Sequence, residues 1–291
     1  MISLPPSSRS QLSWHKFEPS GVDTWKLVFP TYYAELFQDQ TTSILPDRHV
    51  HWRRSSTGKQ KFAYLTGLSE DDISRIRCFV SDYQDHVVLS TPKCLPSHLR
   101  GAADSCLALA FNFCRDAQQN IVHTPVGAQV YGVKYGGQPH LIPDLVDRLA
   151  AAFARVPLNG YGREYVLSYI PISASKTNDL PEQLVTQLSV QLAERSFFRK
   201  ADSVVRPTLN GSKPAFKDLP VNRKFEEWGR IYHEDSVTLS QSVEDCVVYV
   251  IDDLYQSGAT LWSYARFLKD MGASAVRGLV CEKSWSDGDN R

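Results

Sequence analysis

The chain has 291 residues, of which 42% are hydrophobic and 11% aromatic, so it has enough apolar material for packed cores and is not globally disordered. Lys plus Arg and Asp plus Glu both total 32, and this formal net charge of zero excludes a protein that binds polyanions through its overall charge. A chain of this length predicts two domains.

The N-terminal segment, residues 1–20, is rich in Ser and Pro and predicts a poorly ordered arm. It lacks the apolar core of a signal peptide, and no uncharged apolar run in the sequence is long enough to cross a bilayer. We therefore expect a cytoplasmic protein that makes no membrane contact. After the arm we expect a mixed α+β domain of unknown role over residues 21–139 and a second domain over residues 140–291.

The first predicted domain shows mixed helix and strand patterns. Residues 25–37 predict a strand that turns into a short helix, and Ser69 with Asp72 has the spacing of a helix capping box. Residues 102–114 are an apolar helix or a buried strand, and residues 122–135 predict a hairpin because glycines separate their apolar positions. This half shows no catalytic constellation, so we interpret it as a recognition or regulatory domain.

One basic segment of this half, residues 49–61, leaves two interpretations open. His49 and His51 at alternate positions of a strand would share one face and could bind a metal, while the cations beside Trp52 could hold a phosphate backbone. In the other interpretation the segment is a solvated basic strand whose tryptophan packs inward. We favour the second, because no acidic or Cys ligand accompanies the histidines at a suitable spacing.

From residue 143 the sequence pattern changes to alternating helices and strands. The predicted elements are a helix over 144–155, a strand over 165–170, a helix over 179–192 and a strand over 203–206. Asp179 and Glu182 have the spacing of a capping box for the second helix. The alternation indicates parallel βαβ units, so the predicted fold class of this half is α/β, a parallel sheet with flanking helices.

Two polar connections of this half are candidates for anion binding. The loop after the strand over 165–170 supplies hydroxyls, backbone amides and one cation, from Ser173, Ala174, Ser175 and Lys176. Viewed alone, it is equally well an ordinary Ser-rich turn. Residues 207–244 form a connection long enough to be functional or disordered, and Lys213 and Arg223 are its candidates for charge stabilisation, against the plainer interpretation of solvated cations.

The strongest signal lies in residues 247–262, which read VVYVIDDLYQSGATLW. The first five residues show no polar alternation, as expected of a parallel strand covered on both faces. Asp252 and Asp253 then come at the carboxyl end of the strand, where open α/β sheets bind their ligands. The turn that follows opens a helix whose free amides and dipole favour a phosphate, and it consists of Gln256, Ser257, Gly258, Ala259 and Thr260.

Carboxylates beside a phosphate-binding turn fit a sugar phosphate. Asp252 and Asp253 can accept hydrogen bonds from ribose hydroxyls, while the turn amides and the hydroxyls of Ser257 and Thr260 take the 5′-phosphate. Paired acids at a strand end also occur as plain turn residues. The ordered combination of strand, acids, turn and helix favours the sugar phosphate.

This segment resembles the phosphoribosyl pyrophosphate (PRPP) motif of type I phosphoribosyltransferases, and in particular the competence protein F-like group, whose version reads approximately DDVxTTGAT. The matching positions are Asp252, Asp253, Leu254, Ser257, Gly258, Ala259 and Thr260. Gln256 departs from the pattern, because the family usually has a small hydroxyl residue there. The resemblance covers the second predicted domain, and the four-cysteine zinc module common in that group is absent from the sequence.

The resemblance implies a phosphoribosyltransferase-like fold and an enzyme that binds PRPP, or a nucleotide containing ribose 5-phosphate, together with Mg²⁺. Such an enzyme transfers the phosphoribosyl group to an amine or a nucleobase nitrogen and releases pyrophosphate. Asp252 and Asp253 would be catalytic, residues 256–260 would hold the 5′-phosphate, residues 173–176 the pyrophosphate, and Lys213 and Arg223 would lie on a flap. Mg²⁺ would bridge substrate oxygens, with no direct side-chain ligand.

The alternative from another class is a catalytically inactive sensor or effector. It would bind PRPP or a nucleotide through the same residues, and its N-terminal domain would contact a protein or a nucleic acid, for example in a bacterial defence system. A homodimer is a further hypothesis.

Overall fold

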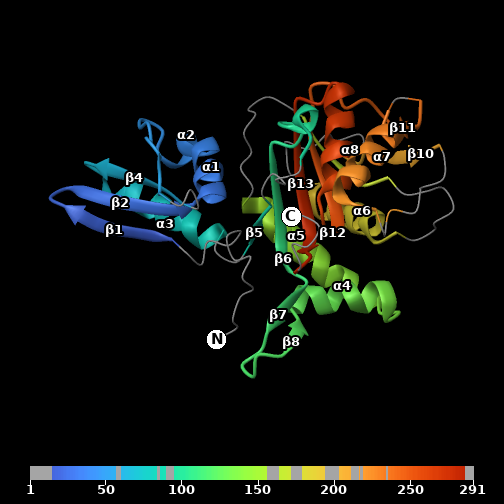
Figure 1. Ribbon diagram of the computed structural model, residues 1–291, viewed down its shortest axis with the longest axis horizontal. Coiled ribbons are helices and arrows are strands. Elements are labelled where there is room, and N and C mark those ends of the chain that lie inside the picture. The colour runs from blue at the N-terminus through green and yellow to red at the C-terminus, as the bar shows by residue number, and fades with distance from the viewer. Residues whose placement is uncertain are drawn as a thin grey trace.

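The structure, a computed structural model, describes residues 15–56, 60–83, 86–89, 95–155, 164–171, 179–193, 203–210, 216, 219–233 and 235–285. Its elements form two groups, an N-terminal lobe on an antiparallel sheet and a larger α/β unit on a mostly parallel sheet (Figure 1). Over these residues, no helix combines the length and the apolar character that a membrane span requires.

The N-terminal lobe has a four-stranded antiparallel sheet in the order β1-β2-β4-β3. Its elements are β1 (Lys16–Gly21), β2 (Thr24–Pro30), α1 (Thr31–Asp39), α2 (Thr41–Ile44), β3 (Arg53–Arg54), β4 (Gln60–Thr66) and α3 (Glu70–Tyr83). The strand-to-helix passage predicted at 25–37 is β2 followed by α1. The predicted capping box opens α3, because Ser69 Oγ accepts from the Asp72 amide and the Asp72 carboxylate accepts from the Ser69 amide, both at 3.1 Å.

The sheet of this lobe buries one face against its helices. Leu27 and Phe29 of β2 and Leu65 of β4 are buried and pack with residues of α1 and α3, whereas Tyr64, next to Leu65 on β4, is 50% exposed. This alternation is the pattern of a strand with one covered face.

The tryptophan of the basic segment packs inward, as the second interpretation expected. The Trp52 ring lies 5.9 Å from that of Phe29 and 5.8 Å from that of Phe37. His49 and His51 precede β3 and do not belong to a strand. Among the described residues no group of three metal-ligating side chains is found.

The α/β unit begins with the short strand β5 (Val87–Val88) and continues to β13. Its other elements are a 3₁₀ turn (Ser97–Leu99), β6 (Ser105–Phe111), β7 (Phe113–Arg115), β8 (Ile121–His123), α4 (Pro125–Tyr135), a 3₁₀ turn (Pro139–Leu141), α5 (Ile142–Arg155), β9 (Tyr165–Tyr169), α6 (Leu180–Leu192), β10 (Pro207–Leu209), α7 (Val221–Ile231), β11 (Val237–Leu239), β12 (Val247–Tyr255), α8 (Ala259–Asp270) and β13 (Ala275–Lys283).

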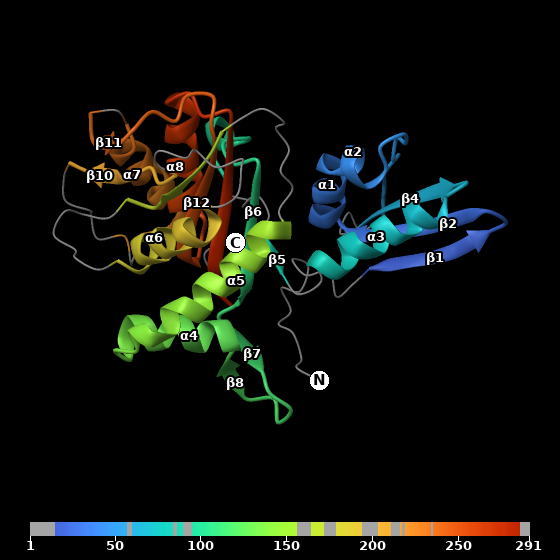
Figure 2. The ribbon, with the colours of Figure 1, turned by 180° about the vertical axis from the view of Figure 1, so that it is seen from behind.

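The central sheet has the order β5-β6-β13-β12-β9, in which β6, β13, β12 and β9 are parallel and β5 is antiparallel at the edge. The predicted α/β class with parallel strands is therefore confirmed. Residues of α5 and α6 pack on one face and residues of α7 and α8 on the other, so the five residues 247–251 are each at most 1% exposed (Figure 2). Two covered faces explain their unbroken apolar run.

The sheet also draws on the first half of the chain. The segment 102–114 contributes β6, the strand alternative, which pairs in parallel with β13. We expected a domain boundary between residues 139 and 140, but the sheet combines strands from both sides of that position. Of the predicted strand over 203–206, Val204 forms a single parallel bridge with Leu167.

Three local predictions were wrong. The described end of the predicted arm over residues 1–20 belongs to strand β1, which pairs with β2. Residues 122–135 form the end of β8 and then helix α4, because Thr124 caps the helix by accepting a hydrogen bond from Gly127 N at 3.0 Å and Pro125 takes its first position. Asp179 is the N-cap residue of α6 but makes no side-chain capping hydrogen bond. Glu182 instead accepts a hydrogen bond from the Tyr169 hydroxyl at 3.1 Å.

Candidate functional site

The two adjacent acids lie near the C-terminal end of β12, at the carboxyl edge of the central sheet. The strand is longer than its apolar run and continues through Tyr255. Asp253 is buried, with 7% of its surface exposed, and Asp252 is half-buried. The Asp252 carboxylate accepts a hydrogen bond from the backbone amide of Asp253 at 2.9 Å, which fixes its orientation at the strand end.

Asp253 forms an ion pair with Lys134, which comes from α4. The Lys134 Nζ lies 2.7 Å from Asp253 Oδ2, and the two side chains are 29% and 11% exposed. Burial acts to lower the pKa of Lys134, but the carboxylates of Asp253 and Asp252 outweigh it and raise the pKa above the usual lysine value. Lys134 therefore stays charged and holds one of the two acids.

The turn after β12 is shaped by Tyr255 and Gly258. Gly258 has φ +80°, and a Cβ at this position would lie 2.2 Å from the Tyr255 hydroxyl oxygen, so only glycine fits. The Tyr255 hydroxyl accepts a hydrogen bond from Trp262 Nε1 at 3.1 Å. Gly258 is thus required for two structural reasons, its positive φ and the closeness of the Tyr255 hydroxyl. The absence of a side chain also lets a ligand approach the backbone of the turn.

The turn leads into the N-terminus of α8. The first i→i−4 hydrogen bond of this helix runs from Trp262 N to Gly258 O, so the amides of residues 259–261 precede the helical ladder. The buried Ser257 accepts from the Ala259 amide through its Oγ at 3.3 Å. Thr260 and Leu261 line a cavity, where their amides and the positive end of the helix dipole favour an anion.

A cavity of about 300 Å³ opens between the acids, the turn and helix α7. It is lined by Lys134, Ile170, Asp179, Pro181, Phe216, Lys224, Trp228, the run from Asp252 to Gly258, Thr260 and Leu261. Two of its lining rings, Phe216 and Trp228, stack at 4.4 Å between centroids, and Tyr232, outside the lining, continues the stack at 4.8 Å from Trp228. The cavity therefore combines carboxylates, two lysines, helix amides and an aromatic wall.

Glu282 adds a buried carboxyl group near this edge. It lies on β13 opposite Leu254, is 8% exposed, and its Oε2 has no hydrogen-bond partner among the described residues. Burial and the negative charge of Asp253 raise the pKa of Glu282 to about 8, against a lowering by Lys134. The group is therefore largely protonated at neutral pH.

The structure places the predicted site residues unevenly. Asp252, Asp253 and the turn over 256–260 all line the cavity, except Ala259, which is buried beside it. Arg223 lies on the exposed side of α7, paired with Glu226, and does not line the cavity. Ser173, Ala174, Ser175, Lys176 and Lys213 lie outside the described residues.

Sequence reasoning missed two lysines of the site. Lys224, next to Arg223, is 8% exposed and lines the cavity, and the amphipathic period of α7 could have shown that residues 224, 225 and 228 share its inner face. Lys134 was hidden by the hairpin prediction. Thr124 followed by Pro125 is a helix-start signal that would have placed it on a helix.

No family model matches the chain, and no curated protein does. Similar solved structures include a hypoxanthine phosphoribosyltransferase from Staphylococcus aureus, at TM-score 0.30 and 14% identity over 48% of this chain and 61% of that one. Another is the hypoxanthine phosphoribosyl transferase of Trypanosoma cruzi, at TM-score 0.29 and 14% identity over 48% of this chain and 60% of that one.

The chain thus spans about three fifths of the length of these solved structures. A likeness of this size does not define an activity.

Proposed function

We propose that this cavity binds PRPP and that the protein transfers the phosphoribosyl group to an amine or a nucleobase nitrogen. The observation that carries the proposal is the convergence, on one cavity, of the carboxylates of β12 and the N-terminus of α8. A ribose 5-phosphate carries hydroxyls and an anion on opposite sides of one small ring. The cavity offers acceptors for the first and amides for the second.

The ribose lies against Asp252 in this proposal. Its hydroxyls donate hydrogen bonds to the half-buried Asp252 carboxylate, while the 5′-phosphate accepts from the amides of Thr260 and Leu261 and from the Thr260 hydroxyl. Lys224, from the opposite wall, adds a positive charge for the pyrophosphate. The resemblance to competence protein F-like phosphoribosyltransferases, which rests on residues 252–260, supports the same placement.

The reaction replaces one bond at the anomeric carbon of the ribose. The bond from C1 to the pyrophosphate oxygen breaks, the acceptor nitrogen forms the new bond to C1 and loses a proton, and pyrophosphate leaves with the electron pair. Positive charge develops on the ribose in between. The carboxylates of Asp252 and Asp253 stabilise it electrostatically in a partly dry site.

The donor set is suited to Mg²⁺ that arrives with the substrate. Carboxylate oxygens are the protein ligands that Mg²⁺ prefers, and Mg²⁺ commonly keeps waters and binds substrate phosphates. Asp252 is half-buried and lines the cavity, so its carboxylate would face the ion directly or through water. Bound Mg²⁺ would neutralise charge on the leaving pyrophosphate.

The alternative, binding without turnover, is favoured by one observation. Lys134 already pairs with Asp253 at 2.7 Å, which makes that carboxylate less available to the ribose hydroxyls and offsets the negative charge that would stabilise the transition state. Such a protein would act as a sensor of PRPP or of a nucleotide, and a second surface would report the bound state to a partner.

Calorimetric titration with PRPP and Mg²⁺ tests the site. We expect binding by the native protein and a loss of about ten-fold or more in affinity for Asp252→Asn/Asp253→Asn, since each charged hydrogen bond contributes about 1.5–3 kcal/mol. Asp144→Asn/Asp147→Asn removes the same charge from the exposed side of α5 and should bind like the native protein. The single variant Asp252→Asn leaves the Lys134 pair intact and guards against a folding defect.

Unchanged affinity in Asp252→Asn and in the double variant would sink the ribose-phosphate assignment. Pyrophosphate release on addition of a nucleobase or amine separates the two candidates. Release that depends on the acceptor identifies a transferase, whereas tight binding without any release identifies the sensor.

A further inference from the structure

The antiparallel sheet of the N-terminal lobe has one face that its helices do not cover. The strand register places two rows of side chains across this face. One row runs Arg53, Phe62, Val28 and Lys16, and the next runs Tyr64, Lys26 and Glu18. The opposite face holds Leu27, Phe29, Ala63 and Leu65 under α1 and α3.

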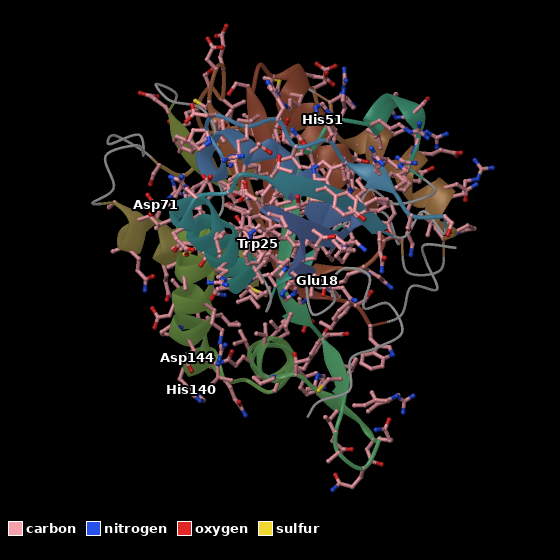
Figure 3. The ribbon with its side chains drawn as sticks, turned by 90° about the vertical axis from the view of Figure 1, so that its left-hand side faces the viewer. Glu18, Trp25, His51, Asp71, His140 and Asp144 are labelled. Atoms are coloured by element: carbon pink, nitrogen blue, oxygen red, sulfur yellow. The ribbon has the colours of Figure 1, made fainter. Side chains whose placement is uncertain are left out.

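The rings and cations of this outer face are accessible. Tyr64 is 50% exposed, Phe62 beside it is half-buried, and their centroids lie 6.0 Å apart. Lys16 and Arg53 are exposed at the two ends of the first row, and Lys26 is partly exposed in the second. Figure 3 looks onto the N-terminal lobe from the left-hand side of Figure 1 and labels Glu18 of the outer face and Trp25, whose register places it on the opposite face.

Charge and shape together select one class of partner. Lys16, Lys26 and Arg53 flank the ring pair together with one carboxylate, Glu18, which lies 3.9 Å from Lys16. Lys26 and Arg53 remain as the excess positive charge, so the face attracts an anion. Cations beside exposed rings on a flat sheet fit single-stranded nucleic acid, whose phosphates pair with Lys and Arg while its unstacked bases lie on the rings. A duplex hides its base faces and would use only the charges.

We propose that the outer face of β1, β2, β4 and β3 is a binding surface for single-stranded nucleic acid. Neighbouring strands lie about 4.8 Å apart, so the first row places cations on both sides of Phe62. One strand of nucleic acid crosses the sheet, with a base on Tyr64, a base on Phe62, and phosphates at Lys26 and Arg53. This surface does not depend on the PRPP cavity.

Fluorescence anisotropy of labelled oligo-dT and oligo-U, each of roughly ten nucleotides, tests the proposal on the full chain. We expect binding that weakens as salt rises from about 50 to about 200 mM. Tyr64→Thr, which keeps a good strand former, should lower the affinity about ten-fold. Lys26→Gln/Arg53→Gln should reduce the slope of log affinity against log salt by about 1.4, since each phosphate contact on a single strand contributes about 0.7.

The matched controls remove the same groups elsewhere. Tyr135→Ala deletes a tyrosine that is 72% exposed on α4, and Arg77→Gln deletes a cation from the exposed side of α3, on the helical side of the same lobe. Both should bind like the native protein. The unfolding midpoint of each variant shows whether it is folded. If Tyr64→Thr is not folded, Tyr64→Ala is measured in its place.

Several results would overturn the proposal. They are an absence of binding at low salt, equal affinity for a duplex of the same length or for polyglutamate, or an unchanged affinity in folded Tyr64→Thr. A loss confined to Tyr135→Ala would move the binding surface to α4 and β8, where Ile121, Val122 and Tyr131 are also exposed.

Discussion

Charged residues occupy different places in the two sheets. At the carboxyl edge of the parallel sheet, Asp253, Glu282 and Lys283 are 7%, 8% and 5% exposed, whereas Lys16, Glu18 and Arg53 of the antiparallel sheet stand in solvent. The parallel sheet is covered on both faces, so a polar group reaches a ligand only where its strands end. The antiparallel sheet has a whole face for contact. Buried charge suits a small ligand in a cavity, and exposed charge suits a long one on a surface.

The largest effect should come from the turn that closes the parallel edge. Gly258→Ala places a Cβ 2.2 Å from the Tyr255 hydroxyl in a residue with φ +80°, and we expect a loss of about 3 kcal/mol in the free energy of unfolding. Gly101→Ala is the matched control, because its φ is +79° and no atom lies within 4 Å of the added Cβ. Urea denaturation should show only about 1–2 kcal/mol for the control. Equal losses would mean that the Tyr255 contact costs nothing.

The buried carboxyl of Glu282 should make stability depend on pH. Its pKa rises from an ordinary value near 4.5 to about 8 in the folded protein, so the folded state binds the proton more tightly than the unfolded chain. The resulting stabilisation is fully present below pH 4.5 and is lost as the pH rises through about 8. The decline is at most about 1.4 kcal/mol per pH unit.

Denaturation curves across that window check this pH effect. Glu282→Gln should flatten the dependence, because the amide stays neutral. Glu18→Gln removes a carboxyl from the solvent-exposed sheet and should leave the dependence as it is in the native protein. If both variants keep the native pH profile, Glu282 is not the group that titrates.

The Lys134–Asp253 pair should matter more than an exposed pair. Lys134→Met leaves the Asp253 carboxylate buried without its cation, and we expect a loss of about 2 kcal/mol in thermal or urea unfolding. Arg266→Met breaks the pair with Asp270, whose side chains are 49% and 53% exposed, and should cost at most about 0.5 kcal/mol. A loss as small for Lys134→Met would show that water reaches the strand end.

The smallest effect contrasts one substitution in the two sheets. Val248→Thr puts a hydroxyl where the residue is 0% exposed and should cost about 1–2 kcal/mol. Val28→Thr puts the same hydroxyl on the outer face of β2, where we expect a change within about 0.5 kcal/mol. Similar losses at both positions would mean that the outer face is covered in solution.

The sequence was most informative where local signals act alone. The apolar run of β12, the helix periods of α5 and α6 and the capping box of α3 all follow from neighbours within a few residues. The central acids and the turn over 256–260 were found because they are contiguous. The structure places most of them around one cavity, and their role is a proposal.

The remaining parts of the site depend on contacts between distant segments. Lys134 belongs to the first predicted domain and Asp253 to the second, so the two residues are far apart in sequence. No spacing rule links such a pair. The pairing of β6 with β13 likewise left no local signal, since a buried apolar strand looks the same whichever partner it has. Thr124 and Pro125 were a local signal that the glycines of α4 obscured.

The pairing of β6 with β13 also bears on how the chain folds. Asp104, just before β6, accepts a hydrogen bond from the Val276 amide at 2.7 Å, across a sequence separation of 172 residues. Closing so long a loop carries a large entropic cost, and proteins rich in such contacts fold slowly. During synthesis β6 emerges well before its partner, with an apolar edge that can pair wrongly. We therefore expect the docking of β13 between β6 and β12 to limit the folding rate of the whole sheet.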